Sequence, residues 1–600
     1  MLLLARTARA FLRPATRLAL RRPAPAWATT ARAATIPELE QEISAQGSKV
    51  KALKTGDGDA DTIKAEVAVL LKLKQDITAL DPTHASAIVD KKKKKPPAKA
   101  LEPKPARDPT MDQIVQLCRQ RGFVFGSSEI YNGFNGFYDY GPMGCELKRN
   151  IKDLWWRDFV HGRDEIHGLD SSIICNPGVW RASGHVEGFS DPMCDDRETK
   201  KRYRADQLFW GEVLDADSGA ALGAVTVMES EDIERDLAAA APFKNFKRPI
   251  AYKSVAEATD AEMARVPPPG APDRIGDLTP PRAFNLMFET KVGAAADAAA
   301  TAYLRPETAQ GIFVNFKNVA ATARGFSIPG GVAQIGKAFR NEITPRNFVF
   351  RSREFEQMEI EYFCSDEGDA WKACHEEWVA ACRAWLVERV GLREELLGEE
   401  VHDELAHYAR ACTDLTFRFP FGEQELQGIA ARGCYDLTQH QEASGKSLEY
   451  VDQASGRKYL PQVIEPSIGV DRLFLAAICS AYCVDEVGGS ERTLLKFAPA
   501  LAPVKCAVLP LSKKDPALLA IARAIHDDLK RRYNVQWDAA GNIGRRYRRQ
   551  DEIGTPLCVT VDFESIEDGC VTVRDRDSTD QIRVTVEDVA AHVVGVIEGL

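Results

Sequence analysis

The stretch from Arg340 to Tyr362, "RNEITPRNFVFRSREFEQMEIEY", decides the fold of this chain. From Phe348 onward it is rich in β-branched and aromatic residues, which favours a strand whose successive side chains point to opposite faces. Pro345 and Asn347 indicate a turn before that strand, so the whole predicts a hairpin. The alternation places two sets on opposite faces: Arg351, Arg353, Gln357, Glu359 and Glu361 on one, and Phe350, Met358, Ile360 and Tyr362 on the core face.

The charged face of this hairpin has two interpretations. A solvated sheet surface with weak ion pairs is the common one. Two details favour a binding site instead: the cations are all arginine, whose guanidinium binds phosphate with two hydrogen bonds, and the acids gather at the far end of the face. We therefore expect a ligand that is anionic at one end and cationic at the other.

Length and composition place the chain among large proteins of several domains. It has 600 residues, of which 44% are hydrophobic and 28% charged, and this predicts two to four domains. No stretch approaches the ~20 consecutive apolar residues of a membrane helix, so we expect no membrane association. The 14 cysteines form no CxxC pair, which argues against a zinc ribbon or a thioredoxin-like motif and favours reduced thiols.

Residues 1–35 have the composition of a transit peptide. Seven arginines and no lysine precede the first acid, Glu38, and they alternate with apolar residues. A disordered basic tail is the alternative. We expect location in the mitochondrial matrix, with an alternative start allowing use in the cytoplasm as well.

The next two segments predict an appended module and a tether. Residues 36–85 favour a helical hairpin, with a turn near Thr55 and an apolar stripe of Ile63, Val67, Leu70, Leu71 and Ile77. Residues 86–110 combine a lysine run with prolines, which predicts an extended linker. This linker could attach to nucleic acid through its lysines, or it could be a solvated tether without a binding role.

The remaining chain divides into a large domain and an α/β domain. Residues 111–495 form the first, with helices expected at 111–121, 144–161, 366–390 and 470–480 and an insertion of separate structure at about 211–300. Residues 500–600 alternate strands and helices, which indicates a mostly parallel sheet with an edge hairpin. The fold class is therefore α+β, with an N-terminal helical hairpin.

Further acids stand in unusual contexts: Glu307 in "YLRPETAQGIF", Glu425 in "GEQELQGIAARGCYDL" and Glu465 in "IEPSIGVDRLFLA". We expect a strand to end at Ile464 and a helix to begin at Val470, so Ser467 and Arg472 lie near a helix N-terminus, which suits anions. Taken singly, each acid is more often a cap or a satisfied ion pair.

Long strings in this sequence resemble a known family. The stretch "FRNEITPRNFVFRSREFEQMEIEYF" resembles motif 2 of the class II aminoacyl-tRNA synthetases, "EPSIGVDRLFLA" motif 3, and "YNGFNGFYDYGPMGCELKRNIKDLWWRDFV" the region of motif 1. The strings "SGHVEGFSDPMCD", "YLRPETAQGIF" and "GCYDLTQHQ" are similar to the dimeric glycyl-tRNA synthetases. The resemblance implies an antiparallel-sheet catalytic domain, a C-terminal anticodon-binding domain and a WHEP module at the N-terminus.

The resemblance also implies roles for particular residues. Arg340, Glu342 and Arg472 would be catalytic, with Mg²⁺ held through Glu425. The ATP-binding set would be Arg340, Asn341, Glu342, Arg351, Ser352, Glu425, Leu426 and Arg472. The glycine-binding set would be Glu307, Glu359, Glu465, Pro466 and Ser467.

The chemistry that the resemblance implies agrees with these residue types. Attack by the glycine carboxylate on the α-phosphorus of ATP builds negative charge that fixed arginines and Mg²⁺ stabilise. Carboxylates bind the glycine ammonium, and a filled pocket wall excludes every larger amino acid, so we expect no separate editing site.

The expected partners are tRNA(Gly) and a second copy of the chain. Arg545, Arg546, Arg548 and Arg549, with Tyr547 between them, form a basic cluster suited to phosphate contacts and base stacking. A solvated basic helix is the alternative. A homodimer is expected by resemblance alone. A sister class II synthetase for serine, proline or threonine, or a non-catalytic tRNA-binding paralogue, remains an alternative function.

Overall fold

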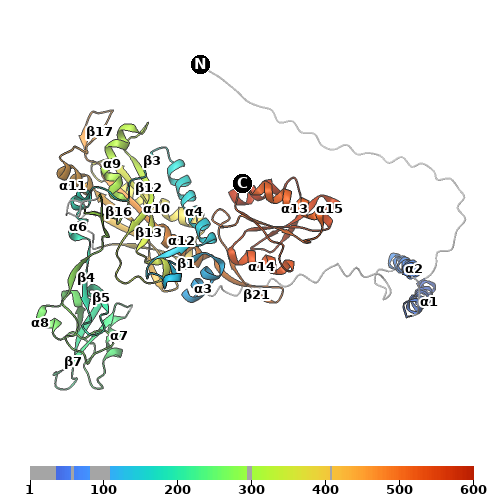
Figure 1. Cartoon of the computed structure of the whole chain (residues 1–600), viewed down its shortest axis with the longest axis horizontal. Helices are drawn as coiled ribbons and strands as arrows, with labels where there is room; N and C mark the ends of the chain where they lie inside the picture. Colours follow the sequence, from blue (N-terminus) through green and yellow to red (C-terminus); the bar gives the residue numbers. More distant parts are fainter. Residues whose placement is uncertain are drawn as a thin grey trace, which may run out of the picture. The chain divides into compact units, whose positions relative to one another are not determined.

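The structure is a computed structural model that describes residues 36–55, 60–80, 108–230, 232–293, 301–403, 405 and 409–599. The chain divides into two compact units, Met1–Glu102 and Pro103–Leu600 (Figure 1). The predicted transit peptide lies outside the described residues, as does most of the predicted linker, so both stay predictions. None of the helices in the described part has the length and apolar character that a membrane span needs.

The first unit contains a pair of helices, as the apolar stripe predicts. Helix α1 (Ile36–Thr55) packs on helix α2 (Ala60–Leu80). Their contact is built from Leu39 and Ile43 of α1 with Leu70 and Leu73 of α2. Leu71, which we expected in the stripe, is 49% exposed, because the buried face of α2 follows Leu70 and Leu73 at a spacing of three.

A seven-stranded sheet is the centre of the second unit. Its strand order is β14-β15-β16-β19-β13-β12-β3, and every neighbouring pair is antiparallel except β12 with β3. The strands are β3 (Ile166–Gly168), β12 (Gly330–Phe339), β13 (Glu354–Cys364), β14 (Leu397–Val401), β15 (Ala411–Phe419), β16 (Gly422–Gly433) and β19 (Gln462–Gly469). This sheet confirms the predicted antiparallel-sheet fold.

Helices cover one face of this sheet and form the main core with it. They are α3 (Met111–Arg121), α4 (Pro142–Trp155), α10 (Ala370–Glu388) and α12 (Val470–Ala481), close to the four helices predicted. Met358, Ile360 and Tyr362 of β13 point into this core, as the alternation predicts. Helices α9 (Ala309–Thr322) and α11 (Tyr435–Ser444) pack on Val332, Phe363 and Val463 at one end of the other face.

The insertion is a lobe with its own sheets, and it begins earlier than expected. Its strands start at Ser190, not near residue 211, because "SDPMCD" pairs with strands further along the chain. One sheet has the order β5-β4-β9 and the other β7-β6-β8. They comprise β4 (Ser190–Asp195), β5 (Arg202–Arg204), β6 (Leu208–Leu214), β7 (Ala221–Met228), β8 (Tyr252–Ser254) and β9 (Arg282–Asn285).

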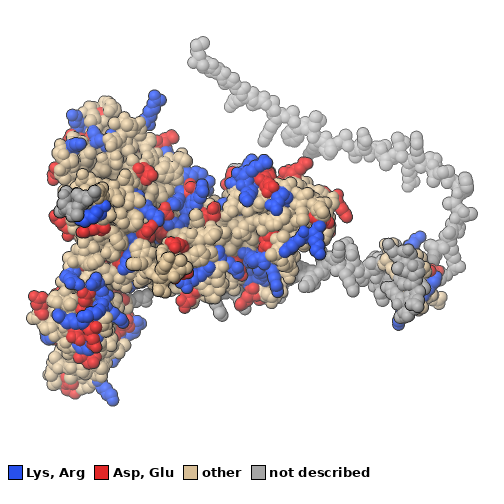
Figure 2. Space-filling view, in the orientation of Figure 1, with Lys and Arg blue, Asp and Glu red and all other residues tan. Residues whose placement is uncertain are grey.

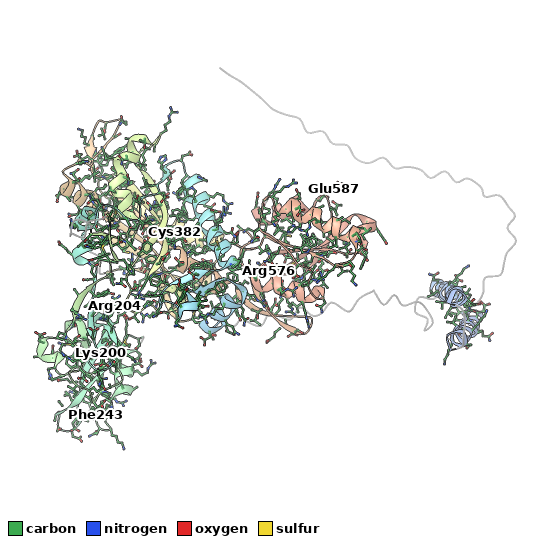
Figure 3. All side chains as sticks on the ribbon, in the orientation of Figure 1. Lys200, Arg204, Phe243, Cys382, Arg576 and Glu587 are labelled. Carbon is green, nitrogen blue, oxygen red and sulfur yellow. The ribbon has the colours of Figure 1, made fainter. Side chains whose placement is uncertain are left out.

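Ion pairs join neighbouring segments within the base of the lobe. Arg204 bonds to Asp206, and its guanidinium lies 3.0 Å from Asp191. Figure 3 shows Arg204 where the lobe meets the larger domain and Phe243 towards the lobe's far end. Helices α7 (Ile233–Ala240) and α8 (Asp260–Met263) complete the lobe.

The C-terminal domain confirms the predicted α/β pattern. Its sheet has the order β23-β22-β24-β25-β26, with β22 parallel to both neighbours and β25–β26 as the edge hairpin. The strands are β22 (Cys506–Pro510), β23 (Val535–Trp537), β24 (Leu557–Val561), β25 (Cys570–Asp575) and β26 (Gln581–Thr585). The helices are α13 (Pro516–Leu529), α14 (Ile543–Ile553), α15 (Glu564–Asp568) and α16 (Val589–Glu598).

A hairpin of β20 (Tyr482–Val487) and β21 (Ser490–Leu495) joins the two domains and packs on α14. Arg492 of this hairpin is 1% exposed and bonds to Asp485 at 2.5 Å and to Asp551 of α14 at 3.1 Å. It also donates to the carbonyl oxygen of Arg576, which Figure 3 shows near the junction. The buried ion pairs fix the C-terminal domain to the end of α12.

Candidate active site

A pocket opens between β13, β16 and the start of α12, and it collects most of the predicted nucleotide residues. Arg340, Glu342, Arg351, Ser352, Glu425, Ser467 and Arg472 all line it, together with Phe350, Phe355, Gln357 and Asp471. These residues are up to 132 positions apart in the chain, as counted from Arg340 to Arg472. The antiparallel pairing of β13 with β19 and of β16 with β19 brings them together.

The segment between β12 and β13 is shaped differently from the predicted hairpin. Phe348–Phe350 is a 3-10 turn, and β13 begins only at Glu354. The predicted turn residue Asn347 has φ 60°, in the left-handed region that asparagine tolerates. Arg351 therefore lines the pocket from a loop, while Arg353, which we expected on the same face, donates instead to the carbonyls of Glu342 and Asn135.

Arg340 is held in place by aromatic rings and one carbonyl. Its guanidinium lies 5.4 Å from the ring centres of both Phe189 and Phe355, and its Nε donates to the carbonyl of Pro306 at 3.1 Å. Such contacts restrict the side chain without neutralising its charge. Glu342, which is 8% exposed, accepts a bond of 2.8 Å from Arg351.

Arg472 covers the opposite wall of the pocket. Its guanidinium lies 4.6 Å from the ring centre of Phe350 and 3.0 Å from the Glu425 carboxylate. The Glu425 side chain is half exposed to the pocket. An arginine stacked on an aromatic ring suits the binding of a planar base. The carboxylate beside it suits the binding of a cation.

Asp471 anchors the start of α12, a role that no sequence pattern indicated. It is 4% exposed and accepts from Tyr140, from Lys148 at 2.8 Å and from the backbone N–H of Glu356 at 2.8 Å. Lys148 also pairs with the Glu356 side chain at 2.8 Å. These contacts tie α4, β13 and α12 together and thereby position Arg472.

The predicted glycine residue Glu359 lies beside the pocket and is saturated with hydrogen bonds. One oxygen accepts from the N–H and the hydroxyl of Thr308, and the other from Gln357 and from Ser467 at 2.7 Å. Burial, then the nearby Glu307, raises the pKa of Glu359. Ser467 and Gln357 both line the pocket. Glu359 therefore acts on the pocket mainly by orienting these two side chains.

Glu465 and Glu307 belong to a buried network centred on Arg432. Arg432 binds Glu465 at 2.9 Å and Asp436 at 2.8 Å, and Gln310 links Asp436 at 2.8 Å to Glu307 at 2.9 Å. Burial raises the pKa of Glu465 to about 8, although Arg432 opposes this shift. Burial alone would raise the pKa of Glu307 too, but His185, Arg432 and Gln310 lower it below its usual range.

Glu361 is the most unusual member of this acidic group. It is 0% exposed, and in the described part of the chain neither carboxylate oxygen has a hydrogen-bond partner. Burial first, then Glu465, raises its pKa well above the usual range. The alternation placed Glu361 on the charged face but could not separate it from Glu359, because both lie on the same face of β13 and burial arises from packing between distant segments.

Arg305 supplies a second buried cation at this end of the pocket. Its guanidinium crosses β12 and donates to the carbonyls of Lys337 and Ser171, both at 2.7 Å. A Cβ at Gly336 would lie 2.2 Å from this guanidinium, so a side chain there would displace Arg305. Four buried acids, Glu359, Glu361, Glu465 and Asp436, and the partly buried Glu307 thus share this region with two arginines.

Three predicted residues contribute less directly. Leu426 is 1% exposed and belongs to the main core, so its side chain does not reach the pocket. The backbone of Asn341 donates to Leu286 at 2.7 Å. Pro466 lies within β19, which continues to Gly469 and does not end at Ile464 as expected.

The predicted tRNA-binding cluster on α14 is corrected in part. Arg546 is 3% exposed and donates to the carbonyls of Gly541 and Pro510, so it cannot contact a ligand at the surface. Arg548 donates to carbonyls of the β20–β21 hairpin, and Arg549 pairs with Asp538. Tyr547 bonds to Thr560. Arg545 is exposed, whereas Arg548 and Arg549 are partly exposed, so a contact of these three with tRNA stays a prediction.

Comparisons with known proteins agree on one family. Residues 290–482 match the model of the tRNA synthetase class II core domain (G, H, P, S and T), residues 505–595 that of the anticodon binding domain, and residues 39–87 that of the WHEP-TRS domain. The chain is 48% identical over 483 residues to the glycine–tRNA ligase of Caldanaerobacter subterraneus subsp. tengcongensis, which covers 80% of this chain and 97% of that protein.

Two further relatives carry the same name. The glycine–tRNA ligase of Chlorobaculum tepidum is 47% identical over 484 residues, and that of Rhodopirellula baltica 45% identical over 536 residues. In both cases the match covers 80% of this chain and 98% of the relative.

The buried acid Glu361 leads to a prediction about stability and pH. Because its pKa is raised in the folded protein, its contribution to stability is complete below the unfolded pKa near 4.5 and is lost as pH rises towards the folded pKa. Glu361→Gln removes this loss. We expect its free energy of unfolding relative to the wild type, measured by denaturant titration, to rise from pH 5 to pH 8 by up to about 1.4 kcal/mol per pH unit.

Glu399→Gln, at an exposed position of β14, is the matched control and should show no such trend. If the difference in stability between Glu361→Gln and the wild type stays constant across this pH range, the raised pKa of Glu361 is contradicted.

Proposed function

This chain belongs to the glycine–tRNA ligase family of class II tRNA synthetases, and we propose that the pocket between β13, β16 and α12 is where it activates glycine. It attaches glycine to tRNA in an ATP-dependent reaction that passes through glycyl-adenylate. The family uses ATP, generally with Mg²⁺.

Arg340 binds the α-phosphate at the point of reaction. In the first step an oxygen of the glycine carboxylate attacks the α-phosphorus, and the bond to the oxygen that bridges to the β-phosphate breaks, releasing pyrophosphate. Negative charge grows on the phosphoryl oxygens during this step. Because Phe189, Phe355 and the Pro306 carbonyl already fix Arg340, its charge stabilises the transition state without reorganisation. Arg351, held by Glu342, adds a second cation on the same side.

Arg472 and Phe350 form the site for the adenine ring. The guanidinium and the ring centre are 4.6 Å apart, so a base inserted between them requires Arg472 to move until each contact reaches ~3.5 Å. Moving Arg472 frees Glu425 from its 3.0 Å ion pair. Glu425 fits as a ligand of Mg²⁺, since that ion is usually bound through one or two carboxylates together with substrate phosphates. The bound ion would neutralise charge on the phosphates.

The excess of acids next to Ser467 provides the site for the glycine ammonium. Glu307 and Glu465 each retain lone pairs that their partners do not use, while Glu359 orients Ser467 and Gln357 towards the pocket. Each charge-assisted bond to the ammonium contributes roughly 1.5–3 kcal/mol. We infer that discrimination is steric, with the buried side chains of β13 and β19 forming a filled wall that a larger amino acid would overpack.

The second step transfers the glycyl group to the tRNA. A ribose hydroxyl at the tRNA end attacks the adenylate carbonyl, the ester forms, and AMP leaves with the electrons of the broken mixed-anhydride bond. The C-terminal domain matches the anticodon binding domain and so supports tRNA recognition. On the face in Figure 2, lysine and arginine side chains lie among acidic ones over this domain, which agrees with recognition by local patches. Arg545 is an exposed α14 arginine available for such a contact.

One observation carries the assignment: the hydrogen bond of 2.7 Å between Ser467 and Glu359 joins the acidic end of the site to the pocket that Arg340 and Arg472 line. A ligand that is anionic at one end and cationic at the other can therefore span both. A class II synthetase for another small amino acid would use the same geometry, and the amino acid dependence of pyrophosphate exchange separates the two functions.

Replacing Arg340 tests the phosphate site. Arg340→Ala removes a fixed cation from the developing charge, and we expect kcat/KM for glycine-dependent exchange of pyrophosphate into ATP to fall roughly 10²- to 10³-fold. Arg346→Ala is the matched control, since Arg346 is an exposed residue of the same loop outside the pocket. Equal activity of the two variants would exclude Arg340 from the reaction.

A homodimer is the assembly that best explains an exposed apolar patch. Ile130, Tyr131 and Phe134 are 89%, 80% and 71% exposed in the loop between β1 (Val124–Gly126) and β2 (Tyr138–Tyr140). Large apolar side chains gathered at one place usually mark an interface. The loop precedes α4, whose Lys148 holds Asp471, so contact with a second copy would brace the active site.

A charge placed in this patch tests the dimer. Phe134→Glu buries an unpaired carboxylate in the interface, and we expect sedimentation analysis at micromolar concentration to show a shift from dimer to monomer. Phe563→Glu introduces the same change at a residue that is 55% exposed in the C-terminal domain and should leave the dimer intact. A wild-type protein that sediments as a monomer would contradict the proposal directly.

A further inference from the structure

A group of metal-ligating side chains lies beyond the residues of the active site. His402 follows β14, and Cys412 and Asp414 lie two residues apart on β15, so their side chains share one face of the strand. The imidazole Nε2, the thiol sulfur and a carboxylate oxygen of these residues all lie within 4.8 Å of one another. In the described part of the chain, this is the one group of three or more such residues that could hold a metal ion.

The three side chains lie close enough to surround one ion, with the imidazole and the thiol next to different oxygens of the Asp414 carboxylate. His402 Nε2 lies 2.8 Å from Asp414 Oδ2, and Cys412 Sγ lies 3.7 Å from Asp414 Oδ1. Zinc bonds of about 2.0–2.3 Å to nitrogen, oxygen and sulfur separate neighbouring ligand atoms by roughly 3.3–3.8 Å in a tetrahedron. Small side-chain rotations therefore suffice to place all three atoms around one ion.

The backbone around the group fixes it in place. The N–H of His402 donates to the Cys412 carbonyl at 3.1 Å, which holds the residue after β14 against β15. Gly428 of β16 lies opposite Asp414, and a Cβ there would come within 3.4 Å of the Asp414 carboxylate. Asp414 is 8% exposed, whereas the His402 side chain is 35% exposed, so the group is built on a buried base with one open side.

The charge and the donor types select the class of ion. Glu400 and Glu425 both act on His402 electrostatically, so the surroundings are acidic and favour a cation. A thiolate with an imidazole and a carboxylate is a set that borderline metals prefer, while Mg²⁺ and Ca²⁺ prefer oxygen ligands alone. Binding through sulfur releases the Cys412 thiol proton to solvent.

We propose that His402, Cys412 and Asp414 form a site for a zinc-class divalent ion, with three protein ligands and a fourth position open to solvent. The alternative is an ordinary His–Asp ion pair with a cysteine beside it, which would tie the chain after β14 to β15. The two differ in one respect that can be measured. A metal site requires the sulfur to bond to the ion, whereas an ion pair does not involve the sulfur.

Cobalt(II) reports on this sulfur directly. The full-length chain, freed of metal by chelation, is titrated with Co²⁺ and its absorption spectrum recorded. We expect one equivalent to produce a thiolate-to-cobalt charge-transfer band with the intense visible bands of a tetrahedral ion, and one equivalent of Zn²⁺ to remove both. Cys412→Ser should abolish the charge-transfer band, and His402→Gln should weaken Co²⁺ binding at least ~10-fold.

The other 13 of the 14 cysteines make a control necessary. Cys145→Ser removes an exposed thiol outside the group and should leave the spectrum and the affinity unchanged. His402 is partly exposed at the end of a strand, so His402→Gln keeps the test valid if Cys412→Ser is poorly folded. The proposal is overturned if no saturable band appears, or if both His402→Gln and Cys412→Ser bind Co²⁺ as the wild type does.

Discussion

A buried guanidinium, Arg432, is bound to Glu465 and Asp436 in a region where carboxylates outnumber cations. Removing acids from water is costly unless each is paired, and here Glu361 has no hydrogen-bond partner in the described structure. The energetic result is visible in the raised pKa values of Glu359, Glu361 and Glu465, all caused first by burial. In the function we propose, the ammonium of the amino acid supplies the missing positive charge at this end of the site.

The antiparallel sheet converts this local charge arrangement into a site with two ends. Strand β13 lies between β12 and β19, and its alternating side chains separate the main core from the polar face. Asp471 then fixes the start of α12 through Lys148 and Tyr140, which places Arg472 across the pocket from Arg340. The cations of the loop and of α12 therefore lie at one end, and the acids of β13 and β19 at the other. The separation of cations from acids follows from the register of β13 with β19 and from the buried carboxylate of Asp471.

The sequence predicted those parts of the site that depend on local pattern or on resemblance. The alternation of Gln357 to Tyr362 was sufficient to assign the two faces of β13. The helices α3, α4, α10 and α12 on the core face were predicted, whereas α9 and α11 on the other face were not. Arg432 and Asp471 were missed because their roles arise from contacts between distant segments. Arg546 of α14 was misjudged for a related reason: a basic run gives no sign that this residue is buried against Pro510. Burial is a property of the packed structure.

The two-ended site is tested most directly by separating the two substrate affinities in Glu307→Gln. Loss of one charge-assisted bond to the ammonium should raise KM for glycine roughly 10- to 150-fold in pyrophosphate exchange, while KM for ATP stays within about twofold. Glu187→Gln, at an exposed acid near His185, serves as the control. An unchanged KM for glycine, or an equal rise in both values, would contradict the assignment of the acidic end to the amino acid.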